Sequence, residues 1–514
     1  MEGKKQKRVF FRMVFGRTGI VVALLLIQLG LLFLSWLALA ERLHMMVWLM
    51  GLVEAAVVIG IFNKDTSTTT VKLAWIVPII LAPALGIGLY FFVQANFGIR
   101  AMRQRMSLIF TNTKANVKQK EALLDQLEQK NPGLYRLSQY LYSTAAAPLY
   151  TNTAVTYFSS GEEKRVALLD ALKSAKKFIF LEYFIIGEGI WWKEILSVLE
   201  QKVAEGVEVR VMFDGIGTLM TLPTHYEQQL RKKGIQAKVF SPVIPLLSTH
   251  QNNRDHRKIA VIDGQMAFTG GINLADEYIN AISVHGHWKD TAVLLRGEAV
   301  QNFTQMFLQM WNVTETKLED FTPYLNSQPV EAKGYVIGYG DSPLDWDLQG
   351  EEVYLHILNQ ATNYVHITTP YLVTDDHLLQ GLLVAAKSGV DVKLILPGIP
   401  DKFLPNTIAK SFYPVLIANG VEIYEYTPGF IHAKSFVSDD VRAVVGTINL
   451  DFRSLYHHFE CAAYMEEVAA VADVEADFQK TLALCRRITM KEYKEFPLRV
   501  RMCGKVMRIL APLM

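Results

Sequence analysis

Two segments of this chain carry histidine, lysine, aspartate, glycine and asparagine in the same order and at the same spacing. The lysine follows the histidine by two positions, and the other three follow after five, seven and three more. The first set is His256, Lys258, Asp263, Gly270 and Asn273, and the second is His432, Lys434, Asp439, Gly446 and Asn449. A lone histidine in a strand is usually a packed residue, but a five-position match that occurs twice indicates a functional site.

The chemistry that suits these residue types is phosphodiester exchange. One imidazole can attack phosphorus to form a phosphohistidine, while a second, protonated imidazole gives a proton to the leaving alkoxide. Two lysines and two asparagines can bind the non-bridging oxygens. Because each set has only one such histidine, we expect both sets to converge on a single phosphate. The lysines supply the charge and no carboxylates have magnesium-site spacing, so we expect no metal and no cofactor.

Each histidine and its lysine should lie on one face of a strand, because residues two apart in a strand share a face. The pair Asp263-Gly264 is a signal for a two-residue hairpin, and Asp439-Asp440 is a weaker one at the matching place. Folding back about these turns predicts Gly271 opposite His256, and Thr447 opposite His432. The asparagines then join the same face, so that Gly271 and Thr447 are also candidates for contact with the phosphate.

The two motif aspartates have an alternative to a catalytic role. Asp263 and Asp439 occupy turn positions, where aspartate is favoured because its side chain bonds nearby backbone groups. A structural role for both therefore stays open beside the catalytic one.

The elements that must position these residues also occur twice. Short apolar runs alternate with helical stretches, as expected for buried strands in a helix-covered sheet. The runs cover residues 177–187, 206–215, 234–242 and 255–264, and then 364–374, 389–398, 420–429 and 431–440. This repeat predicts an α/β fold of two homologous halves that form one body with pseudo-twofold symmetry, with the site at their seam.

Composition indicates a protein that is partly in a membrane. Hydrophobic residues make up 51% of the 514 residues and charged residues 20%. The net charge is +2, so no global field attracts nucleic acid. The three cysteines cannot form a disulfide framework, which fits a reducing compartment.

The apolar excess lies before residue 95. Residues 19–40 carry no charge and are long enough to cross a bilayer. Residues 43–62 contain Glu54, and residues 73–93 are interrupted by Pro78 and Pro83. We expect two or three membrane helices preceding the two halves.

Membrane topology depends on the third of these segments. Basic residues before the first span place the N-terminus inside, and more basic residues after residue 95 also favour the inside. Three full crossings would export the two halves. We expect the third segment to be re-entrant or interfacial, which keeps the catalytic body cytoplasmic in a multi-pass protein of the bacterial cell membrane.

These patterns divide the chain into six parts. They are a basic tail (1–17), a membrane region (18–95), a helical connector (96–150), the first half (151–330), the second half (331–490) and a C-terminal amphipathic helix (491–514). The last part mixes basic and apolar residues, so it is either an interfacial helix or a helix docked on the body.

Several sequence blocks resemble those of the phospholipase D superfamily, and most fully those of bacterial cardiolipin synthases. The blocks are NNRDHRKIAVIDG (252–264), GGINLADEY (270–278), HWKDT (287–291), TPGFIHAKSF (427–436) and GTINLDFRS (446–454). The resemblance covers nearly the whole chain, including the hydrophobic N-terminal region, and implies two phospholipase D-like halves.

The resemblance also implies roles for individual residues. His256 would be the nucleophile and His432 the general acid and base, a choice that the symmetry of the two motifs does not make. Residues that would bind the phosphate are Lys258, Lys434, Asn273 and Asn449, and the acids that would each orient a histidine are Asp290 and Glu460. The chain departs from the family at His458, where an asparagine often precedes Phe-Glu.

The implied reaction is transfer of a phosphatidyl group from one phosphatidylglycerol to another, which gives cardiolipin and glycerol. The expected partners are phosphatidylglycerol, cardiolipin and the membrane, and no nucleic acid is expected. The oligomeric state stays open. The same histidines would also serve a hydrolytic phospholipase D or a transferase that uses phosphatidylethanolamine as donor.

Overall fold

The computed structural model describes residues 23–31, 40–64, 68–94, 97–242, 253–345 and 347–513. The described residues form two compact units. One holds the residues up to Ala101 together with those from Ile509 onward, and the other holds Met102–Pro242 and Asn253–Arg508.

The first unit is helical. Its main elements are α3 (Ala40–Phe62), α4 (Thr69–Leu81) and α5 (Pro83–Gln94), with the short η6 (Ala511–Leu513). Among the described residues, Met45–Phe62 is the one stretch long and apolar enough to cross a membrane. Of the first span predicted from the sequence, residues 23–31 are helical and Ala40 begins α3, while the rest lies outside the described residues.

The third hydrophobic segment is broken, as its prolines predict. It forms α4 and α5, which are separated at Ala82. The two helices approach closely at Gly86, where a Cβ would lie 2.5 Å from the Cα of Ile79. A glycine is therefore needed at this contact. Whether the segment re-enters the membrane stays a prediction.

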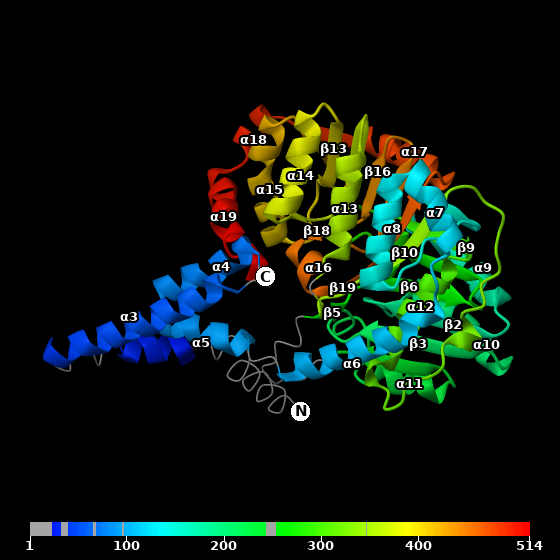
Figure 1. The fold of residues 1–514 in the computed structure, drawn as a ribbon, viewed down its shortest axis with the longest axis horizontal. Coiled ribbons are helices and arrows are strands. Elements are labelled where there is room, and N and C mark those ends of the chain that lie inside the picture. Colours follow the sequence, from blue (N-terminus) through cyan, green and yellow to red (C-terminus); the bar gives the residue numbers. More distant parts are fainter. Residues whose placement is uncertain are drawn as a thin grey trace. The chain divides into compact units, whose positions relative to one another are not determined.

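The second unit contains two mixed sheets (Figure 1). Both sheets have the same strand order. The first sheet runs β1-β9-β7-β6-β2-β3-β4, and the second runs β10-β19-β17-β16-β11-β13-β14-β20. In both, three neighbouring strands are parallel and the motif strand pairs antiparallel with the first of them. Apart from β20 and the short β5 (Arg254–Asp255), which pairs with β19, each strand of one sheet has its counterpart in the other, which confirms the two α/β halves.

The strands of the first sheet are β1 (Thr153–Phe158), β2 (Phe178–Tyr183), β3 (Glu208–Asp214), β4 (Gln236–Phe240), β6 (Lys258–Ile262), β7 (Met266–Gly270) and β9 (Ala292–Gly297). The strands of the second sheet are β10 (Tyr335–Asp341), β11 (Tyr364–Thr368), β13 (Asp391–Pro397), β14 (Glu422–Tyr426), β16 (Ser435–Ser438), β17 (Arg442–Gly446), β19 (His458–Glu466) and β20 (Cys485–Ile488). The short pair β12 (Leu372–Val373) and β18 (Leu450–Asp451) is separate from both.

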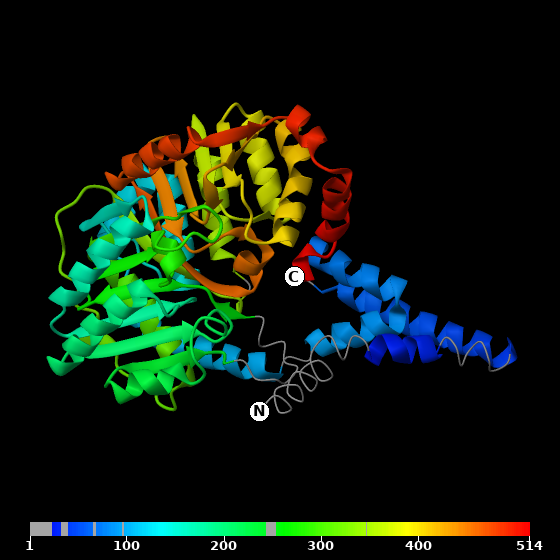
Figure 2. The ribbon, with the colours of Figure 1, turned by 180° about the vertical axis from the view of Figure 1, so that it is seen from behind.

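Helices surround these sheets. In the first half they are α9 (Gly161–Ser174), α10 (Ile190–Ala204), α11 (Tyr226–Lys232) and α12 (Val300–Trp311), and in the second half α13 (Gln349–Gln360), α14 (Asp376–Lys387), α15 (Phe403–Ala418), α16 (Phe452–Tyr456) and α17 (Ala470–Leu482). In the second half, α17 lies on the opposite face of the sheet from α13, α14 and α15 (Figure 2). Both faces of the central strands are therefore covered, which explains their continuous apolar runs.

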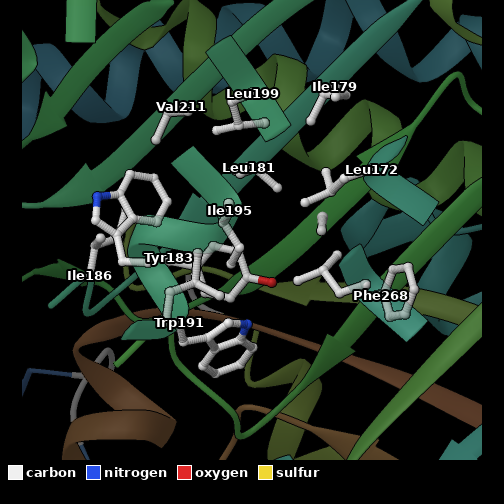
Figure 3. Close-up of a cluster of buried hydrophobic side chains, with 14 of the residues drawn as sticks. Leu172, Ile179, Leu181, Tyr183, Ile186, Trp191, Ile195, Leu199, Val211 and Phe268 are labelled. Carbon is white, nitrogen blue, oxygen red and sulfur yellow. The ribbon is translucent and has the colours of Figure 1, made fainter. Parts of the chain in front are cut away.

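The core of the first half lies between β2 and its covering helices. Every residue of β2 is buried. Tyr183 points toward Trp191 and Ile195 of α10, while Phe268 of β7 lies beside this group (Figure 3). This packing holds β2 and, next to it, the motif strand β6 in place.

The helical connector expected at 96–150 forms α6 (Phe97–Thr113), α7 (Glu121–Lys130) and α8 (Pro132–Ala145). The prediction of a single C-terminal helix over residues 491–514 is wrong. The chain forms α18 (Met490–Glu495) and α19 (Leu498–Arg508), with Pro497 between them. Proline disfavours a helical residue before it, which explains the break. Helix α19 docks on α15, and a Cβ on Gly504 would lie 2.3 Å from the carbonyl oxygen of Thr407.

The two motif hairpins differ from the predicted two-residue turns. Ile262 pairs with Met266 and Ser438 pairs with Arg442, so each loop has three residues. Asp263 and Asp439 both adopt left-handed backbone, with φ of 55° and 57°.

This turn shifts the register by one residue. The predicted pairing of Gly271 with His256, and of Thr447 with His432, is therefore wrong. The backbone N–H of Gly271 instead donates to Thr291, and that of Thr447 to Cys461.

Candidate active site

The seam between the halves is built from two matching strand pairs. In one, β5 (Arg254–Asp255) pairs in parallel with the start of β19. In the other, β15 (Gly429–Ile431) pairs in parallel with β8 (His287–Lys289). Each pair joins the segment before a motif histidine to a strand of the opposite half, which is the arrangement that twofold symmetry requires.

These strand pairs carry both histidines to the seam. The backbone N–H of His256 donates to the carbonyl oxygen of Phe459 at 2.9 Å, and that of His432 donates to Lys289 at 2.7 Å. Both residues are buried, with 7% of each exposed.

Each imidazole binds a carboxylate of the opposite half. His256 Nδ1 lies 2.9 Å from Glu460 Oε1, and His432 Nδ1 lies 2.6 Å from Asp290 Oδ2. A carboxylate that accepts from Nδ1 favours the tautomer in which Nε2 keeps its lone pair. The sequence indicated that these acids would orient histidines, but it did not show that each acid serves the other half's histidine.

The two carboxylates are held differently. A Cβ on Gly271 would lie 2.1 Å from Asp290 Oδ1, so only glycine leaves room for this carboxylate. At the matching place, the hydroxyl of Thr447 donates to Glu460. Gly271 and Thr447 therefore both lie beside an orienting acid.

Both motif lysines are buried beside their histidines. Lys258 Nζ donates to the carbonyl oxygen of His256 at 2.6 Å, and Lys434 Nζ donates to that of His432. Burial lowers the pKa of Lys258 to about 8, against the opposing effect of Glu460. Burial also lowers the pKa of Lys434 to about 7, against the opposing effect of Asp290. Nearby negative charge does not fully compensate the burial of these ammonium groups, so a bound anion would raise both pKa values.

The histidines share one electrostatic environment. Burial and the charge of Lys258 lower the pKa of His256 well below its usual value, and Lys434 and His432 lower it further. Burial and Lys434 lower the pKa of His432 to about 4, although Asp290 opposes this shift. Because groups of each half affect the histidine of the other, the structure brings the two motifs together.

The asparagines are placed less alike than the sequence suggests. Asn273 Oδ1 accepts from the backbone N–H of Ile185 at 3.0 Å, and its Nδ2 donates to the Tyr278 hydroxyl at 2.8 Å. Asn449 is buried, and its Oδ1 has no hydrogen-bond partner among the described residues. Of the two side chains, Asn449 is the freer to accept a hydrogen bond from a ligand.

The motif aspartates lie away from the histidines, at the far ends of β6 and β16. The Asp263 carboxylate accepts from the backbone N–H groups of residues 176, 177 and 178 at 2.7–2.8 Å. Asp439 does the same for residues 362, 363 and 364. Burial would raise the pKa of Asp439, but these donors outweigh it and lower the pKa. This placement favours the structural role and corrects the grouping of both aspartates with the catalytic residues.

The structure brings His458, where the sequence departs from the family, next to the first motif histidine. The ring centroid of His458 lies 5.3 Å from that of His256. In the other half Trp288, also two positions before the orienting acid, lies 5.5 Å from His432. The departure from the family at His458 was the signal that could have identified this position.

Comparison with known proteins places both halves in one family. A family model described as "Cardiolipin synthase, PLD-like domain" matches residues 168–311 and 354–482, one stretch in each half. A second model, "Phospholipase_D-nuclease N-terminal", matches residues 51–94.

Individual proteins extend this result. The chain is 50% identical over 459 residues to an uncharacterized protein of Streptococcus mutans, covering 89% of this chain and 99% of that protein. It is 33% identical over 465 residues to cardiolipin synthase 2 of Bacillus anthracis, covering 89% of each. The crystal structure of phosphatidylserine synthase from Haemophilus influenzae matches with a TM-score of 0.53 and 13% identity, over 75% of this chain and 100% of that one. At this identity the match shows a shared fold.

Proposed function

This chain belongs to the cardiolipin synthase family of the phospholipase D superfamily and is an enzyme of that phosphatidyltransferase type, and we propose that it makes cardiolipin from two molecules of phosphatidylglycerol. The observation that carries the proposal is the reciprocal pair of histidine–carboxylate contacts at the seam, His256 with Glu460 and His432 with Asp290.

In the first step, His256 Nε2 attacks the phosphorus of one phosphatidylglycerol. The bond from phosphorus to the glycerol oxygen breaks, and His432 gives that oxygen a proton as glycerol leaves. In the second step, His432 takes the proton from the primary hydroxyl of a second phosphatidylglycerol. The freed oxygen attacks phosphorus, the phosphorus–nitrogen bond breaks, and cardiolipin leaves.

The protonation states of the two histidines suit this order of reaction steps. A depressed pKa keeps His256 neutral, as a nucleophile requires. His432 must be protonated in the first step, yet its pKa is lowered to about 4 without a ligand. The negative charge of a bound phosphodiester raises the pKa of a neighbouring imidazole, and Asp290 acts in the same direction. Substrate binding would thus create the acid that the first step needs.

Binding of the phosphate would rest on Lys258, Lys434 and Asn449. The non-bridging oxygens carry the negative charge, and two buried ammonium groups stabilise it more strongly than exposed ones would, because the surroundings screen them less. Asn273 would act indirectly, by holding Ile185 and Tyr278 in place.

Transfer must win over hydrolysis, because water is a competing acceptor. A buried site next to a lipid surface excludes water and keeps the second lipid close. Membrane attachment through α3 would supply that position. We also propose that the N-terminal region crosses the membrane more than once and that the catalytic body is cytoplasmic. A C-terminal tag that is labelled from outside intact cells would overturn this orientation.

The decisive experiment traps the phosphatidyl intermediate. With a donor lipid that is labelled in its phosphatidyl group and has a nitrophenol leaving group, which departs without a proton, His432→Ala should retain an acid-labile label on the protein, and His256→Ala should not. The reverse pattern would exchange the two roles. Both variants should unfold at the temperature of the unaltered protein, which separates loss of chemistry from loss of structure.

Product analysis distinguishes the alternative functions. Vesicles that contain labelled phosphatidylglycerol should yield labelled cardiolipin and free glycerol. Phosphatidic acid as the sole product would identify a hydrolase. Cardiolipin that forms only when phosphatidylethanolamine is added would identify a different donor.

A further inference from the structure

Three side chains at the seam have the types and positions of a transition-metal site. Ligand atoms of His256, His458 and Glu460 all lie within 4.8 Å of one another, and all three residues are buried. Glu460 Oε1 is 2.9 Å from Nδ1 of His256 and 3.6 Å from Nδ1 of His458. Two imidazoles and one carboxylate form a common ligand set for zinc.

His458 provides the second observation. It is 8% exposed, and neither of its ring nitrogens has a hydrogen-bond partner among the described residues. Buried polar groups are nearly always paired, so an unpaired imidazole that lies next to a carboxylate and a second imidazole indicates a ligand. The equivalent position in the other half is Trp288, which has no metal-binding atom.

We propose that His256, His458 and Glu460 bind a zinc ion, or a divalent ion of similar ligand preference, and that this ion inhibits the enzyme. Zinc–ligand bonds of about 2.0–2.2 Å in a tetrahedral site separate the ligand atoms by about 3.3–3.6 Å. The observed 2.9 and 3.6 Å need only small side-chain movements to reach this range, and the two imidazole nitrogens, which lie within 4.8 Å of each other, must come into the same range.

Occupancy would disable the nucleophile. The ion would take His256 Nδ1 and a Glu460 oxygen, and so replace the hydrogen bond that orients the imidazole for attack. Magnesium and calcium should not compete, because they prefer oxygen ligands and would meet the positive charge of Lys258 without the gain of strong bonds to nitrogen. The inhibitory effect rests on the proposed function, whereas metal binding does not.

The test compares His458→Asn with a matched control. The described residues contain one other group of this kind, Glu351, Asp375 and His377, and the His377 ring is largely exposed. His377→Asn therefore removes a histidine from the competing group by the same substitution. Zinc binding is measured by competition with a chromogenic indicator on the full-length protein in detergent, and transfer is measured in the same buffer with zinc, magnesium or excess chelator.

Micromolar zinc should inhibit the unaltered protein and His377→Asn, a chelator should restore transfer, and magnesium should have no effect. His458→Asn should weaken zinc binding and raise the inhibitory zinc concentration at least tenfold. Equal zinc sensitivity of His458→Asn and the unaltered protein would overturn the proposal, as would loss of sensitivity in His377→Asn alone. Zinc binding that depends on His458 without any transfer activity would retain the site and overturn the proposed function.

If His458→Asn unfolds at a lower temperature, His458→Gln takes its place with the same expectations. X-ray absorption spectroscopy at the zinc edge provides an independent readout. The expected spectrum has nitrogen and oxygen neighbours, with two imidazoles among them. A spectrum with sulfur ligands would place the ion at a cysteine and overturn the assignment.

Discussion

The two half-sites share one plan and differ in the residues that surround each histidine. His256 has Glu460, Thr447 and His458 around it, whereas His432 has Asp290, Gly271 and Trp288. Duplication thus preserved the backbone scaffold and the histidine–lysine pairs, while the supporting residues diverged. Such divergence is expected when two copies of one unit take different roles, which we propose are nucleophile and acid.

The largest effect should come from the orienting acids. Glu460→Gln and Asp290→Asn should each lower turnover by about 1,000-fold or more, because each leaves its histidine in the wrong tautomer. A donor lipid with a nitrophenol leaving group needs no protonation of that group. The burst of nitrophenolate should therefore recover in Asp290→Asn and stay low in Glu460→Gln. Equal recovery in both variants would contradict the division of roles.

Replacement of either motif lysine should lower activity without lowering stability. Lys258→Met and Lys434→Met should each lower kcat/KM by about 100-fold, because a charge that stabilises the phosphate is lost. Neither should lower the unfolding temperature, since a buried ammonium is costly to keep and methionine fills a similar volume. A clear drop in the unfolding temperature would mean that these lysines mainly support the fold.

The depressed lysine pKa values also predict a pH dependence of stability. The folded protein holds these groups at pKa values of about 8 and about 7, below the usual lysine value of 10.5. Between about pH 7 and pH 10 the unfolded chain therefore binds more protons, and the free energy of unfolding should rise with pH. In chemical denaturation at pH 7 and pH 9, Lys434→Met should show a smaller rise than the unaltered protein. Phosphate binding should weaken over the same interval.

The positions beside the acids should have unequal effects. Gly271→Ala should lower turnover by about tenfold or more, because the added methyl group would displace the Asp290 carboxylate. Thr447→Ala removes one hydrogen bond to Glu460 and should lower turnover only a few fold. A larger effect at Thr447 would mean that this hydroxyl contacts the substrate.

The motif aspartates should have the smallest effect on chemistry. Asp263→Ala and Asp439→Ala each remove an acceptor for three backbone N–H groups, and should lower the free energy of unfolding by about 2 kcal/mol or more. Turnover of the folded protein should stay within about threefold of normal. The Asn variants keep one acceptor oxygen and should lose less stability. A large loss of turnover at full stability would restore the catalytic interpretation.

Much of the fold and part of the site could be predicted. The two halves follow from repeated apolar runs, because burial patterns are local. The predicted hairpin register was wrong by one residue, since each turn holds a third residue, Gln265 or Val441, before the next strand begins. Pro497 is a local signal for the break between α18 and α19, and the prediction of a single C-terminal helix did not take it into account.

The sequence by itself determined which histidines and lysines form the candidate site, because the same motif occurs twice and each lysine, two residues after its histidine, reaches that histidine's carbonyl oxygen. Only the tertiary structure decided that Glu460 serves His256, that Asp290 serves His432, and that His458 joins the first pair. These contacts join residues more than 140 positions apart along the chain. They depend on how the two halves pack, and that packing is set by long-range burial that no local pattern records.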